Sequence, residues 1–293
     1  MDDPTKARVR LYLRSERARG LSAVPAREPT PGSGFSAAQE PAEPKPAPAR
    51  ATSKPDPRPA RQSPAAQAVL PGATAEVKVA GFAPIPLDQP FTAPLLTTEE
   101  KRQRLSAMNE KEVRPCTRCR LCETRTNTVF GEGDIDAKIF FIGEGPGETE
   151  DQTGRPFVGR AGELLNKMIA GMGLAREQVY IANIVKCRPP NNRVPAPDEV
   201  ATCTPYLERQ LEIIRPSAIV TLGLPSTQYM LQTKLSMGRM RGQCHAWRGI
   251  PLMPTYHPAY VLRNPTYETR SAVWSDLKQV LAKLGLPVPK KNV

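Results

Sequence analysis

The chain has 293 residues, a net charge of +12 and 33 prolines, and these figures exclude several classes of protein. No apolar run approaches the roughly 20 residues that a membrane-spanning helix needs, and the first residues lack the apolar core of a secretory signal. We therefore expect a cytoplasmic protein that does not bind membranes. The excess of Lys and Arg favours a polyanionic partner such as nucleic acid, although many soluble proteins are also basic.

The first third of the chain differs in composition from the rest. Residues 1–95 are rich in Pro, Ala, Ser, Arg and Glu, and such segments cannot bury enough apolar surface to offset their chain entropy. We predict a disordered extension over 1–95, one compact domain over 96–286 and a short tail over 287–293. A short helix over 5–19 could dock on a protein partner, but an unstructured basic tail is the simpler interpretation.

Strands and helices alternate along the compact domain. Short apolar runs predict strands at 138–142, 179–183, 218–222 and 251–254. Helical spacing of apolar residues predicts helices at 97–111, 160–172, 197–214, 226–231 and 269–284. The third of these helices contains Pro205 and should break or kink there. Repeated strand–helix units predict an α/β fold in which helices cover both faces of a four-stranded parallel sheet.

The first strand ends in a glycine-rich turn at 143–147, followed by Glu148, Glu150, Asp151 and Phe157. So many glycines predict a tight loop whose backbone approaches its neighbours closely. A phosphate-binding loop would offer backbone N–H groups and a Lys rather than several carboxylates. The combination therefore predicts a site at the carboxyl edge of the sheet.

Two further polar residues follow later strands. Asn183 ends the second predicted strand and His257 follows the fourth, so parallel topology brings both to the edge that carries Glu144. The simpler alternatives are that Asn183 is a turn residue, that His257 caps a turn and that Phe157 belongs to the core.

Six cysteines suggest a metal centre. In a reducing compartment, metal ligation explains closely spaced thiols better than disulfides do. The spacing allows either zinc or a [4Fe–4S] cluster. We take Cys122 as a small buried residue and Cys244 as structural. The ligand set that we favour is Cys116, Cys119, Cys187 and Cys203.

Four motifs, in this order, resemble the family 4 uracil-DNA glycosylases, the iron–sulfur branch of the uracil-DNA glycosylase superfamily. They are GEGPGE from Gly143, GRPFVG from Gly154, NIVKCRPP from Asn183 and HPAY from His257. The four favoured cysteines match as well, and the resemblance covers roughly 115–284. It implies a three-layer αβα fold behind the disordered extension, with a [4Fe–4S] cluster. It also implies base excision repair, in which the uracil N-glycosidic bond in DNA is hydrolysed.

The chemistry of the matching residues suits that reaction. The target nucleotide must leave the duplex to be attacked, and Phe157 would stack on the flipped uracil. The Asn183 amide both donates and accepts, which matches the O4 and N3–H groups of uracil. His257 could donate a hydrogen bond to O2 as the leaving base gains negative charge. Gly145 is a further expected uracil contact, although the best-known branch of the superfamily has Asp there.

The residue that assists the attacking water is less clear from the motifs. We expect Glu150 to position water or to stabilise the developing oxocarbenium ion, with Glu144 as the second candidate. Within the segment 256–265, Tyr260, Leu262 and Arg263 are expected to contact DNA, with Leu262 as an apolar wedge and Arg263 on a phosphate.

Other functions remain open at this point. The chain could be a non-catalytic, DNA-binding iron–sulfur module associated with a DNA polymerase, or an electron-transfer protein. Retention of Phe157, Asn183 and His257 argues for the glycosylase. We expect a monomer that acts on uracil-containing DNA, with a structural cluster and a possible protein partner for the extension.

Overall fold

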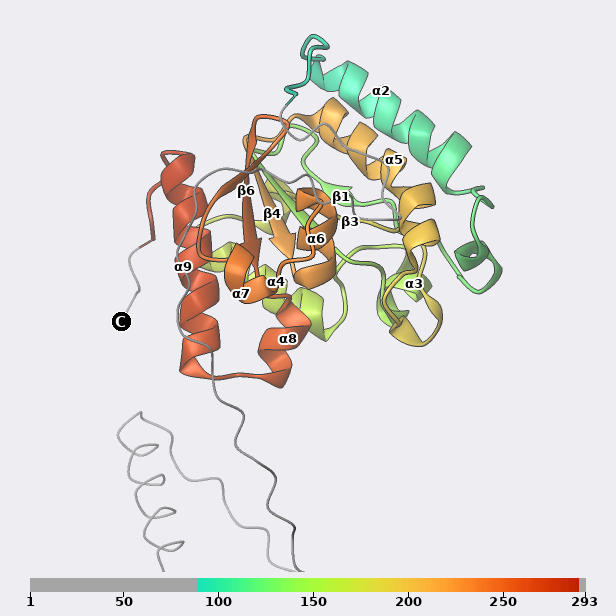
Figure 1. The fold of residues 1–293 in the computed structure, drawn as a ribbon. Coiled ribbons are helices and arrows are strands. Elements are labelled where there is room, and N and C mark those ends of the chain that lie inside the picture. Colours follow the sequence, from blue (N-terminus) through green and yellow to red (C-terminus); the bar gives the residue numbers. More distant parts are fainter. Residues whose placement is uncertain (1–88, 290–293) are drawn as a thin grey trace, which may run out of the picture. The chain divides into compact units, whose positions relative to one another are not determined.

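The computed structural model describes residues 89–289 (Figure 1). The predicted helix at 5–19 and its protein partner lie outside the described residues, as does most of the predicted extension. Residues 89–95 are described, and they pack against the domain. Among the described residues, no helix combines the length and apolarity needed to cross a membrane.

Helices form at the places that the apolar spacing predicted. Thr97 caps the first one, since its Oγ1 accepts from Glu100 N while the Glu100 carboxylate accepts from Thr97 N. The long helices are α2 (Thr98–Met108), α4 (Arg160–Gly171), α5 (Pro197–Ile214), α6 (Leu224–Leu231) and α9 (Tyr267–Lys283). Shorter ones are α3 (Glu148–Thr153), α7 (Met237–Met240) and α8 (Pro258–Arg263).

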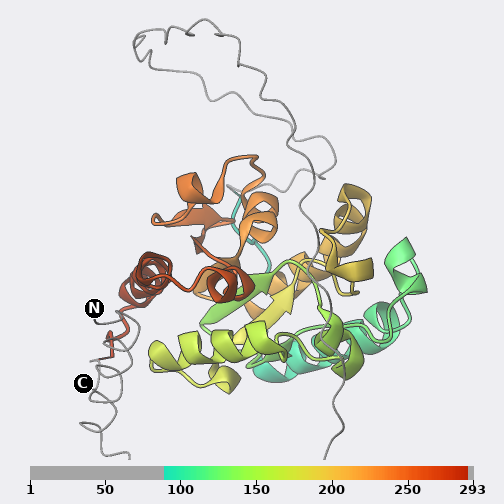
Figure 2. The ribbon, with the colours of Figure 1, turned by 90° about the horizontal axis from the view of Figure 1, so that it is seen from below.

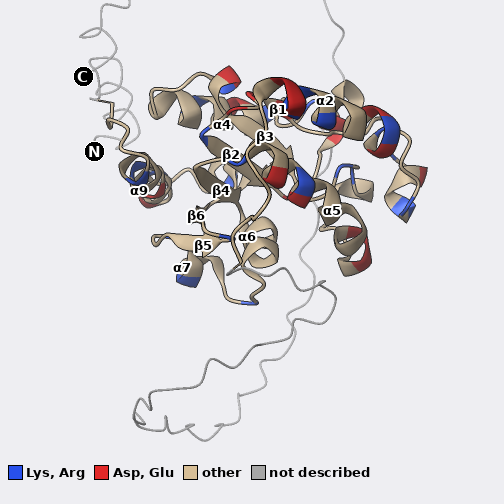
Figure 3. Cartoon of the chain, turned by 90° about the horizontal axis from the view of Figure 1, so that it is seen from above, with Lys and Arg blue, Asp and Glu red and all other residues tan. Residues whose placement is uncertain are grey.

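The sheet has six strands rather than the predicted four. Its strands are β1 (Glu132–Gly133), β2 (Ile139–Gly143), β3 (Tyr180–Asn183), β4 (Ala218–Leu222), β5 (His245–Trp247) and β6 (Ile250–Thr255). They lie in the order β1-β3-β2-β4-β6-β5, as the labels in Figure 3 follow one another. The inner four are parallel and are the predicted strands, whereas β1 and β5 pair antiparallel at the two edges. Both edge strands are too short to show a period-2 pattern in the sequence.

Alternate residues of the inner strands point to two separate cores. Phe140 and Ile142 face the core that contains residues of α2, α5 and α6. Ile139 and Phe141 face the core that contains residues of α4 and α9. Figures 2 and 3 show these helix groups on opposite sides of the sheet. The predicted αβα layering is therefore confirmed, with a mixed sheet in the middle.

The proline inside α5 does not end the helix. Pro205 lies in the middle of an unbroken run of 18 residues, so the helix does not break there, and the kink that was the other predicted outcome stays a prediction. Buried side chains on both sides of the proline, including Cys203 and Leu207, anchor both halves of the helix in the core. Their burial outweighs the backbone hydrogen bond that proline removes.

Residues 89–96 form a strap across the edge strand β5. The Phe91 ring meets Trp247 edge-on with centroids 5.7 Å apart, between the guanidinium groups of Arg215 and Arg248 at 4.2 and 4.0 Å. Arg248 Nε also donates to Gln89 O at 3.1 Å. The folded unit thus begins before the predicted boundary at residue 96, because an aromatic ring at position 91 completes its packing.

Replacing Phe91 with Ala tests this strap. The loss of a half-buried aromatic ring and its cation–π contacts should lower the free energy of unfolding by about 1–2 kcal/mol. Urea denaturation followed by circular dichroism measures the change. The control is Leu95→Ala, since Leu95 is 75% exposed and should cost nothing measurable. Equal stability of the Phe91→Ala and wild-type proteins would contradict the packing role.

Candidate active site

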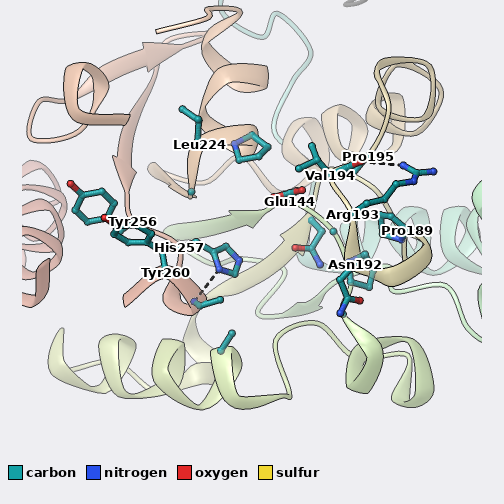
Figure 4. A pocket seen from close by; sticks show the side chains of 18 of the residues that line it. Glu144, Pro189, Asn192, Arg193, Val194, Pro195, Leu224, Tyr256, His257 and Tyr260 are labelled. Atoms are coloured by element: carbon teal, nitrogen blue, oxygen red, sulfur yellow. Dashed lines mark hydrogen bonds between the residues drawn. The ribbon is translucent and has the colours of Figure 1, made fainter. Parts of the chain in front are cut away.

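A cavity of about 870 Å³ opens at the carboxyl edge of the parallel strands (Figure 4). Loops that follow β2, β3, β4 and β6 line it, as the parallel topology predicted. Most of the predicted site residues reach this one cavity. Those that line it are Glu144, Gly145, Glu150, Phe157, Asn183, His257, Tyr260 and Arg263.

Asn183 presents an unpartnered oxygen in the cavity wall. The residue is 1% exposed, and its Oδ1 has no hydrogen-bond partner among the described residues. A buried acceptor without a donor is rare in folded proteins, and it indicates a ligand that brings the donor. Gly143 lies opposite Asn183 in the sheet, and a Cβ there would come within 2.3 Å of Oδ1. Glycine is therefore required for the amide to occupy this place.

Phe157 adopts a backbone conformation that non-glycine residues rarely adopt. Its φ is +51°, and its ring is 5% exposed beside Gly143. Such strain persists only where the surroundings hold it. Here Arg176 Nη1 donates to Phe157 O at 3.2 Å, while Arg176 Nη2 pairs with Glu132 at 2.6 Å. Arg176 and Glu132 escaped the sequence analysis because a single sequence carries no signal that links residues 44 positions apart.

His257 caps α8 and also faces the cavity. Its Nδ1 accepts a hydrogen bond from Ala259 N at 3.1 Å, so the neutral ring carries its proton on Nε2. Burial, and next the charge of Arg263, lower the pKa of His257 to about 4. The ring centroid lies 5.6 Å from that of Phe157. His257 therefore fills the turn-capping role and is also a neutral donor at the ring of Phe157.

The two candidate carboxylates have different surroundings. Glu150 Oε1 accepts from Val158 N and Gly159 N at 2.9 and 3.0 Å, and its Oε2 accepts from Gly147 N at 3.1 Å. Glu150 thus ties the turn before α3 to the loop that carries Phe157. No hydrogen bond of this kind reaches Glu144 from the described residues, and burial raises its pKa above that of an ordinary carboxyl. Of the two carboxylates that line the cavity, Glu144 is therefore the one that accepts no backbone hydrogen bond from the described residues.

Gly145 is fixed by its neighbours. A Cβ at this position would lie 2.8 Å from Val185 Cγ2 and 3.6 Å from Pro189 Cδ. The backbone of the turn therefore forms the cavity wall itself, because no side chain fits between it and the loop after β3.

The residues predicted to contact DNA lie on α8. Tyr260 and Leu262 are 40% and 39% exposed, and Arg263 is exposed as well. Leu262 does not line the cavity, whereas Tyr260 does and stacks on Tyr256 at 4.9 Å. The apolar side chain of Leu262 thus lies exposed next to residues that line the cavity. A second exposed apolar residue, Val194, lines the cavity and is 61% exposed, and no sequence motif pointed to it.

Five cysteines surround a small separate cavity. Its lining includes the predicted ligand set and Cys122, while Cys244 lies elsewhere. Among the described residues, no three ligand side chains converge closely enough to grip a single metal ion. Two N–H groups point at the sulfurs, since Arg125 Nη1 donates to Cys187 Sγ at 3.0 Å and Lys186 N to Cys203 Sγ at 3.2 Å. Cysteine sulfurs around a hollow, with N–H···S donors, fit an iron–sulfur cluster. Cys122 is half-buried, so the prediction that it is a buried residue is wrong.

A buried carboxylate braces the loop between Cys187 and Cys203, which forms one side of the mouth. Glu199 is fully buried and accepts from Arg193 Nη2 at 2.6 Å, from Arg120 Nε at 2.8 Å and from Ala196 N at 2.7 Å. Arg193 and these other contacts hold the pKa of Glu199 at about 2. The sequence predicted a helix over 197–214, but not the arginines that meet the acids of its first turn.

Comparison with known proteins supports one family. The sequence pattern of the Uracil DNA glycosylase superfamily matches residues 130–278, just over half of the chain. A type-4 uracil-DNA glycosylase of Thermotoga maritima is 48% identical over 180 residues, covering 61% of this chain and 94% of the relative. One of Saccharolobus solfataricus is 49% identical over 183 residues, covering 59% and 84%. These matches confirm the resemblance that the four motifs predicted.

A more distant similarity bears on the alternative functions. A DNA polymerase of Bacillus phage SP01 is 33% identical over 175 residues, which are 59% of this chain but 18% of the polymerase.

Replacing Glu199 with Gln tests the brace. Loss of the buried charge opposite two arginines should lower the free energy of unfolding by about 2–3 kcal/mol. Since the pKa is about 2 when folded and 4.5 when free, this stabilisation is complete above pH 4.5 and is lost as pH falls towards 2. Denaturation between pH 2 and 7 should show this pH dependence in the wild type and less of it in Glu199→Gln. Asp198→Asn, at a side chain 69% exposed, is the matched control and should change little.

Proposed function

The chain belongs to the uracil DNA glycosylase superfamily, and on that premise we propose that it excises uracil from DNA. The reaction is hydrolysis of the N-glycosidic bond of a flipped-out deoxyuridine, which releases uracil and leaves an abasic site for base excision repair. The observation that carries the proposal is the buried, unpartnered Oδ1 of Asn183 beside the ring of Phe157. A flat base that brings an N–H donor completes this arrangement.

Asn183 reads the base by its hydrogen-bond pattern. Its Oδ1 would accept from uracil N3–H, and its Nδ2 would donate to uracil O4. Cytosine presents an acceptor at N3 and a donor at C4, so both contacts would fail. Phe157 stacks on the base, and Gly145 lets the turn backbone lie against its edge. Selectivity for uracil over cytosine therefore rests on one amide that the fold holds fixed.

His257 stabilises the departing base. Bond cleavage leaves negative charge on uracil, and a donor aimed at O2 lowers the barrier. Because Ala259 N occupies Nδ1, the Nε2–H group of His257 is the one available to the cavity. A pKa of about 4 keeps the ring neutral at physiological pH, so it donates a hydrogen bond without supplying a full proton.

A carboxylate stabilises the sugar as it becomes cationic and positions the attacking water. We assign Glu144 to this role, since it lines the cavity and its pKa is raised by burial alone. Glu150, the first candidate from the sequence, already accepts three backbone hydrogen bonds. We propose that Glu150 acts on the reaction by holding the Phe157 loop.

DNA lies across the mouth of the cavity in this proposal. Leu262 fills the space that the flipped nucleotide leaves, Tyr260 contacts the strand and Arg263 binds a phosphate. Their exposure on the short helix α8, directly after His257, supports these roles.

Cys116, Cys119, Cys187 and Cys203 would hold a [4Fe–4S] cluster. Hydrolysis transfers no electrons, so the cluster supplies a cross-link between the segment before β1 and the two ends of the loop 187–203. Residues of that loop, including Val194, line one side of the cavity mouth. We propose that the enzyme is monomeric and cytoplasmic and that its extension binds a protein partner.

A non-catalytic module associated with a polymerase is the second candidate, favoured by the similarity to part of a phage DNA polymerase. Such a module would have no use for an unpartnered Asn183 beside a neutral His257. Incubating the protein with a uracil-containing oligonucleotide, followed by alkali, separates the two functions. Strand cleavage at uracil supports the glycosylase, and intact strands with bound protein support the module.

Asn183→Asp tests base recognition. The variant keeps the shape but replaces the amide donor with a second acceptor, so a matched buried hydrogen bond is lost at a cost of about 1–3 kcal/mol. Uracil release in single-turnover assays should fall at least tenfold, and trace release of cytosine becomes possible. A rate for uracil equal to that of the wild type would remove Asn183 from base recognition.

Glu144→Gln tests the carboxylate. Because burial raises the pKa of Glu144, the single-turnover rate should fall as pH drops through a value above 4.5, where the carboxylate takes up a proton. Glu144→Gln should be at least tenfold slower, with no such acid limb. Glu148→Gln is the control, since Glu148 is exposed and does not line the cavity. An unchanged acid limb in Glu144→Gln would assign that limb to another group.

The colour of the purified protein tests the cluster. Thiolate–iron charge transfer should give a brown protein with broad absorbance near about 400 nm. Cys187→Ser should lose colour and solubility, while Cys244→Ser, away from the cysteine cavity, should lose neither. Colourless protein with one zinc per chain would contradict the cluster.

A further inference from the structure

Lys186 is a buried cation between the cysteine cavity and the base pocket. It follows β3 by three residues and precedes Cys187, and its side chain is 1% exposed. Burial of a Lys is costly unless its ammonium is hydrogen-bonded and its charge compensated. The excision mechanism above gives this residue no task, so its place in the interior calls for another explanation.

The ammonium makes two hydrogen bonds in the interior. Lys186 Nζ donates to the main-chain O of Asn183 at 2.9 Å and to Gln210 Oε1 at 2.6 Å. Gln210 Nε2 in turn donates to Phe130 O at 2.9 Å. Lys186 therefore folds back on the residue that reads the base and ties it to the middle of α5. This holds the end of β3, and with it the direction in which the Asn183 amide points.

Lys186 lines the cysteine cavity rather than pairing with a carboxylate. No carboxylate of the described residues forms an ion pair with Lys186, whose main-chain N donates to Cys203 Sγ at 3.2 Å. Lys101 offers a contrast within the same chain, since its ammonium also donates to a main-chain O but pairs with Asp136 at 2.7 Å.

We propose that Lys186 is a positioning residue for base recognition. Its ammonium fixes the main chain of Asn183, and the thiolates of the cysteine site provide the compensating negative charge. The inference rests on the proposed excision of uracil and extends it, because one side chain then links the cysteine site to the base pocket. Loss of this side chain should loosen Asn183 while leaving the rest of the pocket in place.

A double-mutant cycle tests the link. Single-turnover release of uracil is measured for the wild type, Lys186→Met, Asn183→Ala and the double variant. Met fills a similar volume without the charge. Lys186→Met should slow release at least tenfold when Asn183 is present and less than threefold when it is Ala. An equal loss in both backgrounds would mean a general structural role and overturn the proposal.

The second readout is the reduction potential of the cluster, followed by its absorbance in a redox titration. Removing a positive charge disfavours the added electron, so the midpoint in Lys186→Met should move to a more negative potential. Lys101→Met should change neither the potential nor the cleavage rate. An unchanged midpoint in Lys186→Met, or a colourless wild-type protein, would overturn the part of the proposal that concerns the thiolates.

Two outcomes separate this inference from the proposed function. Wild-type protein that releases no uracil contradicts the function itself, whereas active wild type with an unaffected Lys186→Met contradicts only the inference. If Lys186→Met does not accumulate as folded protein, the same cycle is run with Lys186→Arg, which keeps the charge but displaces the donors. The slowing of uracil release by Lys186→Arg should again depend on Asn183. An equal slowing with and without Asn183 would overturn the proposal.

Discussion

The pocket depends on one close approach between neighbouring strands. Gly143 and Asn183 end β2 and β3 at the same level, and the Asn183 amide oxygen occupies the space where a side chain at 143 would begin. The Phe157 ring lies against the same point, since a Cβ at 143 would come within 2.6 Å of its Cζ. Both strands are buried along their whole length, so neither can retreat. The amide, the ring and the empty space between them are therefore fixed together.

Charged groups around the pocket divide into those that hold the fold and those that face the cavity. Glu150 accepts hydrogen bonds from backbone N–H groups, and Glu199 accepts them from arginines and a backbone N–H group. Glu132 forms ion pairs with two arginines. Glu144 has no such partner among residues 89–289, and burial raises its pKa. Carboxylates that are hydrogen-bonded within the protein make the loops rigid. A site that holds a flipped base in one orientation requires such rigid loops. Glu144, which we propose acts on the sugar, is the one of these carboxylates without such a partner among the described residues.

Much of this arrangement could be predicted from the sequence, and the failures have physical reasons. The four inner strands are apolar throughout, so periodicity and composition located them, and parallel topology then brought Asn183 and His257 to one edge. The edge strands β1 and β5 have two and three residues, too few for any pattern. The place of Glu150 depends on a loop folding back over nine positions, and that of Arg176 on a contact across 44. Such contacts follow from the tertiary structure, which local patterns do not encode.

The short edge strands matter when several copies of the protein bind one DNA molecule. A long exposed edge offers unpaired backbone groups to any extended chain, including another copy of the same protein. Here the sheet ends in strands of two and three residues, and the strap of residues 89–96 packs its Phe91 ring on Trp247 of β5. Little backbone is left for a second chain to pair with. Neighbouring molecules on one stretch of DNA could thus come close without joining their sheets.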